Sequence, residues 1–251
     1  MKKIILGILA VTLFSPQLIS AKEFDVEKFE KVAEEVKYYK TVSKNSVSFY
    51  ENTINDNNIS ETVEISKEEF DSVKPGENMI NGPGYTNTDY KSLTTTIYSN
   101  GSKYRYSATL NWKIFPSVRS YDVLAIGHLS NVKYSSNLNF SQYYCTTGGG
   151  CRTLTSYYSK ITSTGCGAAF KVPTGSLTKL SQTLTFDVIK NTNATVTSQS
   201  AYGDYSHATS SVTSDKAQSY NIGTSGISFY NGVGSSYDNI VPAVATWSGS
   251  W

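Results

Sequence analysis

The most regular pattern in the chain is a strict alternation of apolar and polar side chains over residues 103–114. The even positions are all aromatic or aliphatic, and the odd positions are Lys, Arg, Ser, Thr or Asn. Successive side chains of a β-strand point to opposite faces, so this pattern predicts a strand with one face in a core and one in water. Asn100-Gly101 stands just before it and predicts a type I′ hairpin turn, because both central residues of that turn need positive φ.

Further short runs with strand-like composition follow this hairpin. The expected strands cover residues 121–127, 138–145, 180–189, 194–202 and 205–212. Gly203-Asp204 is expected to form the turn between the last two. No segment after Gly82 has a helical period. Many short strands separated by turn residues predict an all-β fold, either an antiparallel β-sandwich or a partly open barrel.

The N-terminal part has helical rather than strand-like spacing. Apolar residues recur at intervals of three and four over residues 26–39, which predicts an amphipathic helix. Residues 41–59 lack a period and are expected to be a linker. Ser66 and Glu69 fit a capping box, which predicts a second helix of about two turns. The sandwich is therefore expected to be preceded by a short helical N-terminal segment.

The first residues have the parts of a secretory signal peptide. Lys2 and Lys3 precede an apolar run over residues 4–14, and Ala21 offers a small residue at the cleavage position. An apolar run of about eleven residues is too short to span a membrane. We therefore expect residues 1–21 to be removed and the mature protein to be secreted.

Charge divides the remaining chain into two parts. Residues 22–80 carry fourteen Asp and Glu against eight Lys and Arg, a net charge of −6. Residues 81–251 carry six Asp, no Glu and twelve Lys and Arg, a net charge of +6. The acidic part is interpreted as a helical leader and linker, either an N-terminal arm or a propeptide that covers the basic part by long-range attraction. The basic part is the expected β-sandwich domain.

Three cysteines in an exported chain predict one disulfide and one thiol. Cys145 and Cys151 flank a five-residue turn, and a hairpin would place them opposite each other, so this pair is expected to be bridged. Pairings with Cys166 stay open, because spacing alone does not exclude them. The cysteines and two distant histidines lack the paired spacing of a structural zinc site, so no metal is expected.

The sequence offers one weak catalytic arrangement. Cys166 would be the nucleophile of a thiol hydrolase and His207 its base, oriented by Asp204 or Asp187. His128, at the end of an apolar strand, is expected to be a hydrogen-bonded structural residue. The chain contains neither a Gly-x-Ser-x-Gly elbow nor a His-Glu-x-x-His zinc motif. An enzyme is therefore the less favoured class, and no cofactor is expected.

Binding residues are expected on the basic and aromatic faces of the strands. Lys103, Arg105 and Lys113 share the polar face of the most regular strand. Tyr202 and Tyr205 belong to a large set of tyrosines that cannot all point inward. Exposed Tyr gives a large contact area at low entropy cost, and a basic, aromatic face suits a glycan, an anionic envelope polymer or a protein. A modest positive charge without a recognition motif does not indicate nucleic acid.

A pore-forming toxin is a second class that the sequence permits. Residues 177–213 are rich in Ser and Thr and would form an amphipathic hairpin, and a strand needs only about 9–11 residues to span a membrane. The apolar side of this hairpin is thin, because Ser198 and Ser200 would have to face lipid. A membrane partner is expected only if this alternative holds.

Two short segments carry a resemblance to known proteins. Asn111-Trp112-Lys113 with the following Pro116-Ser117, and Arg119-Ser120-Tyr121-Asp122, resemble exported proteins of Gram-positive bacteria that have no assigned function. The resemblance covers residues 85–145 and implies export, and no catalytic or binding residue transfers with it. The sequence as a whole predicts a secreted bacterial β-sandwich that acts by binding an extracellular or cell-envelope ligand.

Overall fold

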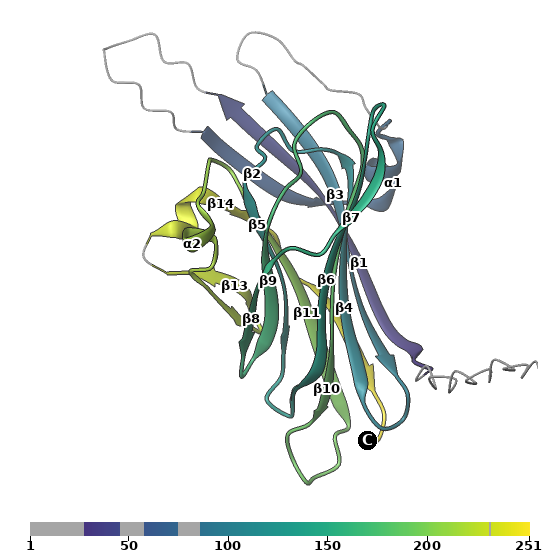
Figure 1. Cartoon of the computed structure of the whole chain (residues 1–251). Coiled ribbons are helices and arrows are strands. Elements are labelled where there is room, and N and C mark those ends of the chain that lie inside the picture. Colours follow the sequence, from purple (N-terminus) through teal and green to yellow (C-terminus); the bar gives the residue numbers. More distant parts are fainter. Residues whose placement is uncertain (1–27, 46–57, 75–85, 231) are drawn as a thin grey trace, which may run out of the picture.

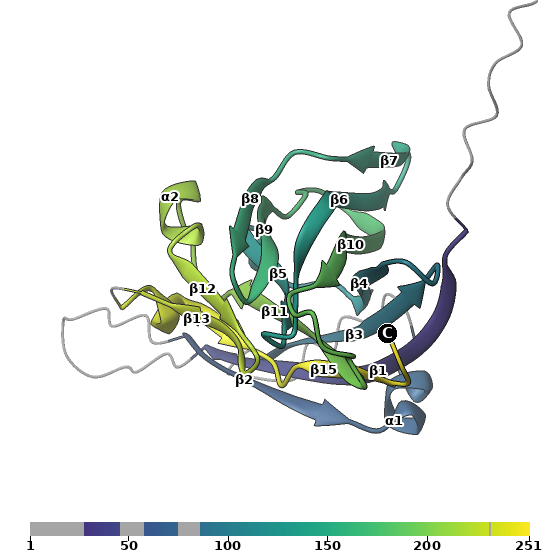
Figure 2. The same ribbon diagram turned by 90° about the horizontal axis from the view of Figure 1, so that it is seen from below.

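Two antiparallel sheets face each other in the computed structural model, which describes residues 28–45, 58–74, 86–230 and 232–251 (Figures 1 and 2). The predicted fold class, an all-β antiparallel sandwich, is confirmed. The expected signal peptide lies outside the described residues.

Sheet A is the larger layer, with the spatial order β2-β1-β3-β4-β10-β6-β7. In that order its strands cover Asn58–Ile65, Glu30–Asn45, Thr86–Ser99, Tyr104–Ile114, Leu177–Lys190, Val132–Thr146 and Gly150–Leu154. Sheet B has the order β14-β11-β5-β9-β8, and β15 also pairs with β11. These strands cover Tyr237–Asn239, Ser198–Ala208, Tyr121–His128, Gly165–Lys171, Tyr158–Thr162 and, for β15, Ala243–Ser248.

Smaller elements lie beside the two sheets. They are the hairpin of β12 (Tyr220–Gly223) and β13 (Gly226–Phe229), the helices α1 (Lys67–Ser72) and α2 (Ser214–Ala217), and the 3-10 helix η1 (Val233–Ser236). In Figure 1, α1 lies near the strands of sheet A, whereas α2 and β13 lie on the side of sheet B.

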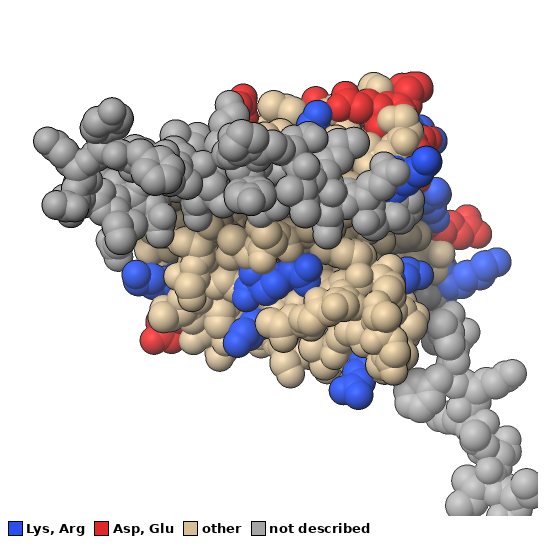
Figure 3. Space-filling model, turned by 90° about the horizontal axis from the view of Figure 1, so that it is seen from above, with Lys and Arg blue, Asp and Glu red and all other residues tan. Residues whose placement is uncertain are grey.

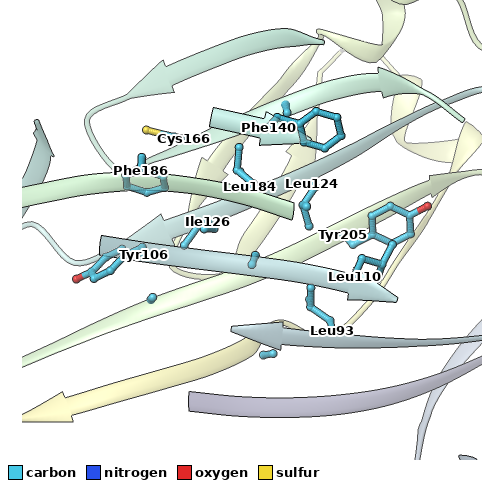
Figure 4. Packing of buried hydrophobic residues seen from close by; sticks show 14 of the residues in the cluster. Leu93, Tyr106, Leu110, Leu124, Ile126, Phe140, Cys166, Leu184, Phe186 and Tyr205 are labelled. Atoms are coloured by element: carbon cyan, nitrogen blue, oxygen red, sulfur yellow. The ribbon is translucent and has the colours of Figure 1, made fainter. Parts of the chain in front are cut away.

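Strand β4 has the sidedness that its alternation predicts. All of its even-numbered residues, from Tyr104 to Ile114, are buried, whereas Asn111 between them is exposed. The buried side chains join the main core, in which Leu110 of β4 lies in one cluster with Leu124 and Ile126 of sheet B (Figure 4). The core therefore fills the space between the two sheets.

The hairpin before β4 is confirmed, but its turn differs from the predicted type. Ser99 pairs with Tyr104, so the connecting loop is longer than two residues. Gly101 has a φ of 87° and Asn100 has no positive φ. The Oδ1 atom of Asn100 accepts the N–H of Lys103 at 2.9 Å, so the Asn side chain closes this loop.

The helix predicted over residues 26–39 is wrong, because strand β1 begins at Glu30. Val32 and Val36, which contribute to the helical spacing, are each 39% exposed, whereas Tyr39 is buried against the core. β1 pairs with β3 over fourteen residues and with β2 over eight. These long-range hydrogen bonds outweigh a local helical preference, which is worth less than about 1 kcal/mol per residue.

The boundary expected at residue 80 does not separate a leader from the sandwich. Because β1 lies between β2 and β3, a domain that began at residue 81 would lack two strands of sheet A. Lys37 of β1 pairs with Glu64 of β2 at 3.0 Å, and the Tyr39 hydroxyl donates to the carbonyl of Val241 at 2.5 Å. A removable propeptide does not fit a strand that is paired on both sides.

The predicted linker is partly wrong, whereas the predicted capped helix is confirmed. The linker over residues 41–59 is partly strand, since β1 continues to Asn45 and β2 begins at Asn58; residues 46–57 lie outside the described part. The capped helix is confirmed as α1, where the Ser66 hydroxyl accepts the N–H of Glu69 at 3.1 Å. Apart from α1, the described N-terminal segment is strand and not helix.

Strand β11 runs straight through Gly203-Asp204, where the sequence predicts a turn. A Cβ atom on Gly203 would lie 2.0 Å from the Oγ1 atom of Thr95 in sheet A. This glycine therefore serves the close approach of the two sheets. The carboxylate of Asp204 accepts the N–H of Ile227 at 2.5 Å, which ties β11 to β13.

Residues 177–213 do not form the hairpin on which the pore-forming alternative depends. β10 lies in sheet A between β4 and β6, whereas β11 lies in sheet B beside β5. The two strands pair with different partners in opposite layers, so the sequence between them crosses the sandwich.

The disulfide prediction is confirmed. Cys145 and Cys151 are opposite each other in the β6–β7 hairpin and are bonded. Cys166 is a buried free thiol, which excludes the pairings that spacing left open.

Candidate binding site on the outer face of sheet A

Lys103 and Arg105 do not form a free basic face. Arg105 donates from Nε and Nη2 to the two carboxylate oxygens of Asp187, at 2.7 and 3.2 Å, and the ammonium of Lys103 lies 3.9 Å from the same group. The Asp187 side chain is fully buried, and Asn137 donates to it at 2.6 Å. Both basic residues compensate a buried charge, which would be costly without them.

Lys113, the third basic residue of the predicted face, holds helix α1. Its ammonium donates to the carbonyl of Asp71 at 3.1 Å and to the carbonyl of Phe70, and it lies 4.7 Å from the centroid of the Phe70 ring. The last carbonyls of a helix have no partner within the helix, so this cation fastens the end of α1 to β4.

The two predicted tyrosines lie on sheet B and face opposite sides of β11. Tyr205 is completely buried and belongs to the core, so the prediction of a surface contact there is wrong. Tyr202 is half-buried, and by strand alternation it points away from sheet A. The structure therefore does not bring the five predicted ligand contacts together.

Tyr205 and His207 instead belong to a buried cluster around Asp122. The Asp122 carboxylate accepts the N–H of Ala208 at 2.9 Å, and His207 Nδ1 lies 3.0 Å from it. The Tyr205 hydroxyl donates to the same carboxylate, and burial together with this negative charge raises the pKa of Tyr205 well above its ordinary value. Every one of these contacts is internal to the fold.

Lys91 adds a buried cation beside this cluster. It is fully buried, it donates to Thr41 at 2.6 Å and to Asp89 at 3.0 Å, and its ammonium lies 4.9 Å from the centroid of the Trp112 ring. The Trp112 ring in turn contacts His207, with the centroids 5.7 Å apart. The polar contacts of Lys91 lie within sheet A, and the ring contact of Trp112 with His207 joins sheet A to sheet B. All of these groups are buried.

The residues of the thiol hydrolase alternative are separated in the fold. Cys166 pairs with Ile126 on β5, and Ile126 pairs with Gly203 on β11, so His207 lies two strands away and four residues farther along. At about 3.3 Å per residue this distance excludes contact. Figure 4 shows Cys166 and Tyr205 at opposite ends of the core. Burial also raises the pKa of the Cys166 thiol to about 12, which disfavours the thiolate.

The second histidine, His128, is a hydrogen-bonded structural residue, as expected. His128 is buried, and its Nδ1 atom lies 2.9 Å from the carbonyl of Leu129. Burial lowers the pKa of this imidazole.

A different feature stands out on the outer face of sheet A, where small polar side chains line up across four strands. The register of β3, β4, β10 and β6 places them in three rows. The rows are Ser92, Asn111, Ser181 and Tyr143; Thr94, Thr109, Thr183 and Ser141; and Thr96, Ser107, Thr185 and Asn139. We call these residues the polar array. Their sequence neighbours Leu93, Leu110 and Leu184 are buried in the core, so the array lies on the opposite face.

The array offers closely spaced hydrogen-bonding groups in fixed positions. Hydroxyl and amide groups can each donate and accept. The hydroxyls of Thr109 and Thr183 lie 3.1 Å apart at its centre, and Asn111, Asn139 and Tyr143 are exposed at its margins. The β-branched Thr side chains have few rotamers, so little freedom is lost when they bind a ligand.

The sequence contains a signal for this array. Residues 94–96, 107–109 and 183–185 each place two hydroxyl side chains on one face of a strand. Which of these strands are neighbours depends on the register, and β10 is paired with β4 across more than seventy residues of chain. The alternation therefore reveals the hydroxyl pairs within each strand, but it does not reveal that these pairs line up across the sheet.

A pocket of about 490 Å³ adjoins the end of the array that is nearest α1. Ser92 and Asn111 belong both to the first row of the array and to the wall of this pocket. The rest of the wall, which is mainly apolar, is formed by Phe70, Trp112, Lys113, Phe115, Leu177, Thr178 and Lys179. Helix α1 therefore completes a pocket that sheet A alone would leave open.

Basic side chains lie scattered over the face of the molecule that Figure 3 shows. Figure 3 shows Lys and Arg as separate positions on a largely neutral surface, and Asp and Glu gathered mainly at one corner. No continuous basic patch is visible on the described residues in this view. This face therefore offers isolated basic side chains and not a broad basic surface.

No protein-family model matches this chain, and no curated protein matches it. Within the described ranges, no group of three or more His, Cys, Asp or Glu is placed to hold a metal ion. None of the described helices is both long and apolar enough to cross a membrane. The polar array and the adjoining pocket are the features from which a function can be inferred.

Proposed function

We propose that this protein is a secreted bacterial binding protein that holds a glycan across the polar array. The single observation that carries the proposal is the register of β3, β4, β10 and β6, which sets hydroxyl and amide side chains in three rows on the outer face of sheet A. Most of these side chains are partly exposed, whereas those of Ser92, Thr96 and Ser107 are buried. Strands lie about 4.8 Å apart, so the array spans about 14 Å across the sheet, enough for an oligosaccharide.

The chemistry of the array favours a glycan over a protein partner. The cores of protein interfaces are enriched in aromatic residues, Met and Arg. The centre of the array consists of Thr109, Thr183 and similar small polar residues, and larger rings such as Tyr143 lie at its margin. A sugar presents several hydroxyls on a short ring, and each needs a donor or acceptor when it leaves water.

Two observations support the extracellular location that we propose. The N-terminal residues have the charge and apolar pattern of a signal peptide. The bonded pair of Cys145 and Cys151 is the kind of bond that persists in oxidising compartments. Detection of the protein in culture supernatant, with a mass that begins at Lys22, tests this part of the proposal.

The central test removes the hydroxyls at the middle of the array. In the double variant Thr109→Val and Thr183→Val, both partners of one hydrogen bond become apolar groups of the same shape, so the fold should keep its stability. Isothermal titration with soluble bacterial polysaccharides should show binding by the wild-type protein and about tenfold weaker binding by the variant.

A matched control exists on the other sheet. Ser200 and Thr246 form a hydroxyl–hydroxyl contact of 3.0 Å in sheet B, away from the array. The double variant Ser200→Ala and Thr246→Val should bind like wild type. Equal affinities for both double variants, or no binding of any polysaccharide by the wild-type protein, would contradict the proposed function.

A further inference from the structure

Among the described residues, the pocket beside the array contains one cation for which no anionic partner is seen. Lys179 is exposed, and its ammonium lies 5.1 Å from the centroid of the Tyr143 ring. No carboxylate or carbonyl of the described residues forms an ion pair or hydrogen bond with it. Lys113, the other cation in the wall, is already bonded to two carbonyls of α1. Lys179 is therefore the positive charge that this pocket can offer to a ligand.

Three neutral groups in the same wall also lack partners within the described ranges. The side chains of Ser92, Asn111 and Thr178 form no hydrogen bond with the part of the chain that the structure describes, although each can donate and accept. Phe70, Phe115 and Leu177 supply the apolar surface between them in the same pocket. The wall thus combines one free cation, several uncommitted polar groups and an apolar surface.

We propose that this pocket binds an acidic residue of a glycan, with Lys179 pairing its anionic group. The inference rests on the proposed function, because Ser92 and Asn111 make the pocket continuous with the first row of the array. Asn111 and Thr178 bond ring hydroxyls, and the apolar surface contacts the C–H face of the ring. The glycan is therefore an acidic polymer, whose charged residue occupies the pocket while neighbouring residues lie across the array.

The shared chemistry is an anionic group on a sugar or sugar-like unit, which a carboxylate or a phosphate can provide. The experiment therefore uses oligogalacturonate, a carboxyl-reduced form of the same oligomer, and a poly(glycerol phosphate) oligomer as separate titrants. Wild-type protein should bind at least one acidic oligomer more tightly than the neutral one. The acidic oligomer that binds more tightly identifies the anionic group.

The variant Lys179→Met tests the role of the cation. Because the side chain is exposed, the substitution should leave the fold intact, and affinity for the acidic oligomer should fall about fivefold. Affinity for the neutral oligomer should not change. The salt dependence of acidic-oligomer binding should also become shallower, since one ion pair has been removed.

Lys171→Met is the matched control. Lys171 is exposed and lies on β9 of sheet B, away from the pocket, and its substitution removes the same charge from the protein. It should leave both affinities unchanged. Equal binding of acidic and neutral oligomers, with no effect of Lys179→Met, overturns the acidic-ligand inference while the proposed glycan function stands. Failure of wild-type protein to bind any oligomer overturns both.

Discussion

At the scale of single residues, charge and burial explain most differences between the expected and observed roles. The alternation of β4 correctly predicts that Arg105 lies on the polar face. It does not predict Asp187, which arrives from β10 and engages that guanidinium in two hydrogen bonds. A side chain's direction follows from its own strand, whereas its partner depends on a strand elsewhere in the chain. The basic face predicted from one strand is therefore partly neutralised by another.

Asp204 should give the protein an unusual dependence of stability on pH. Burial raises its pKa from an ordinary 3.8 to about 7. Between pH 3.8 and 7, Asp204 keeps its proton in the folded protein but loses it in the unfolded chain. The contribution of Asp204 to the free energy of unfolding is therefore fully present below pH 3.8 and is lost as the pH rises to 7. Relative to Asp204→Asn, the wild-type free energy of unfolding should fall by up to about 4 kcal/mol from pH 4 to 7.

Urea unfolding of both proteins at several pH values between 4 and 8 measures this difference. The other carboxylates are common to the two proteins and cancel in the comparison. Parallel stability profiles would show that Asp204 is ionised at all these pH values.

At the scale of elements, the sequence predicts strands well when the pattern is local. The alternation of β4, the capping box of α1 and the spacing of the Cys145–Cys151 hairpin are all visible within a dozen residues. β1 is different, because apolar positions such as Val32 and Val36 fit a helical spacing and its strand state comes from pairing with β2 and β3. The same holds for the polar array. The hydroxyl pairs within each strand can be recognised in the sequence, whereas their alignment into rows depends on the register of strands that are distant in the chain.

Gly203 of β11 should not tolerate a side chain, because it lies where the two sheets approach closely. Gly203→Ala would place a Cβ atom 2.0 Å from the Thr95 hydroxyl and should lower the free energy of unfolding by about 1–3 kcal/mol. The Thr95 hydroxyl has no hydrogen-bond partner among the described residues, so Thr95→Ala alone should cost little. The double variant should recover part of the loss, which chemical denaturation can measure. Equal losses with and without Thr95→Ala would mean that the sheets do not meet at this point.

At the scale of the whole molecule, the acidic and basic parts of the sequence fold together, because both contribute strands to sheet A. The net charges of −6 and +6 predict two units, but sheet A takes strands from both. Composition describes how charge is distributed along the chain, whereas strand pairing decides which segments fold together. The acidic part supplies β1, β2 and the helix that completes the candidate pocket.

Removal of residues 1–57 should therefore prevent cooperative folding, since it deletes β1 from the interior of sheet A. Removal of residues 1–27, which precede the described part, should leave the fold intact. Far-ultraviolet circular dichroism and thermal unfolding of the two shortened chains distinguish these outcomes. A cooperative transition in the shorter chain would instead support the propeptide interpretation.

The contacts of β1 with Val241 and with β15, about two hundred residues farther along, bear on how the protein folds during synthesis. Tyr39 donates to the carbonyl of Val241, and the carboxylate of Glu35 accepts the N–H of Val244 at the start of β15. Because β1 contacts Val241 and Val244, a growing chain cannot form these contacts until that segment has been synthesised. The nascent polypeptide would stay open as it leaves the ribosome, which is the state that a translocation channel can thread.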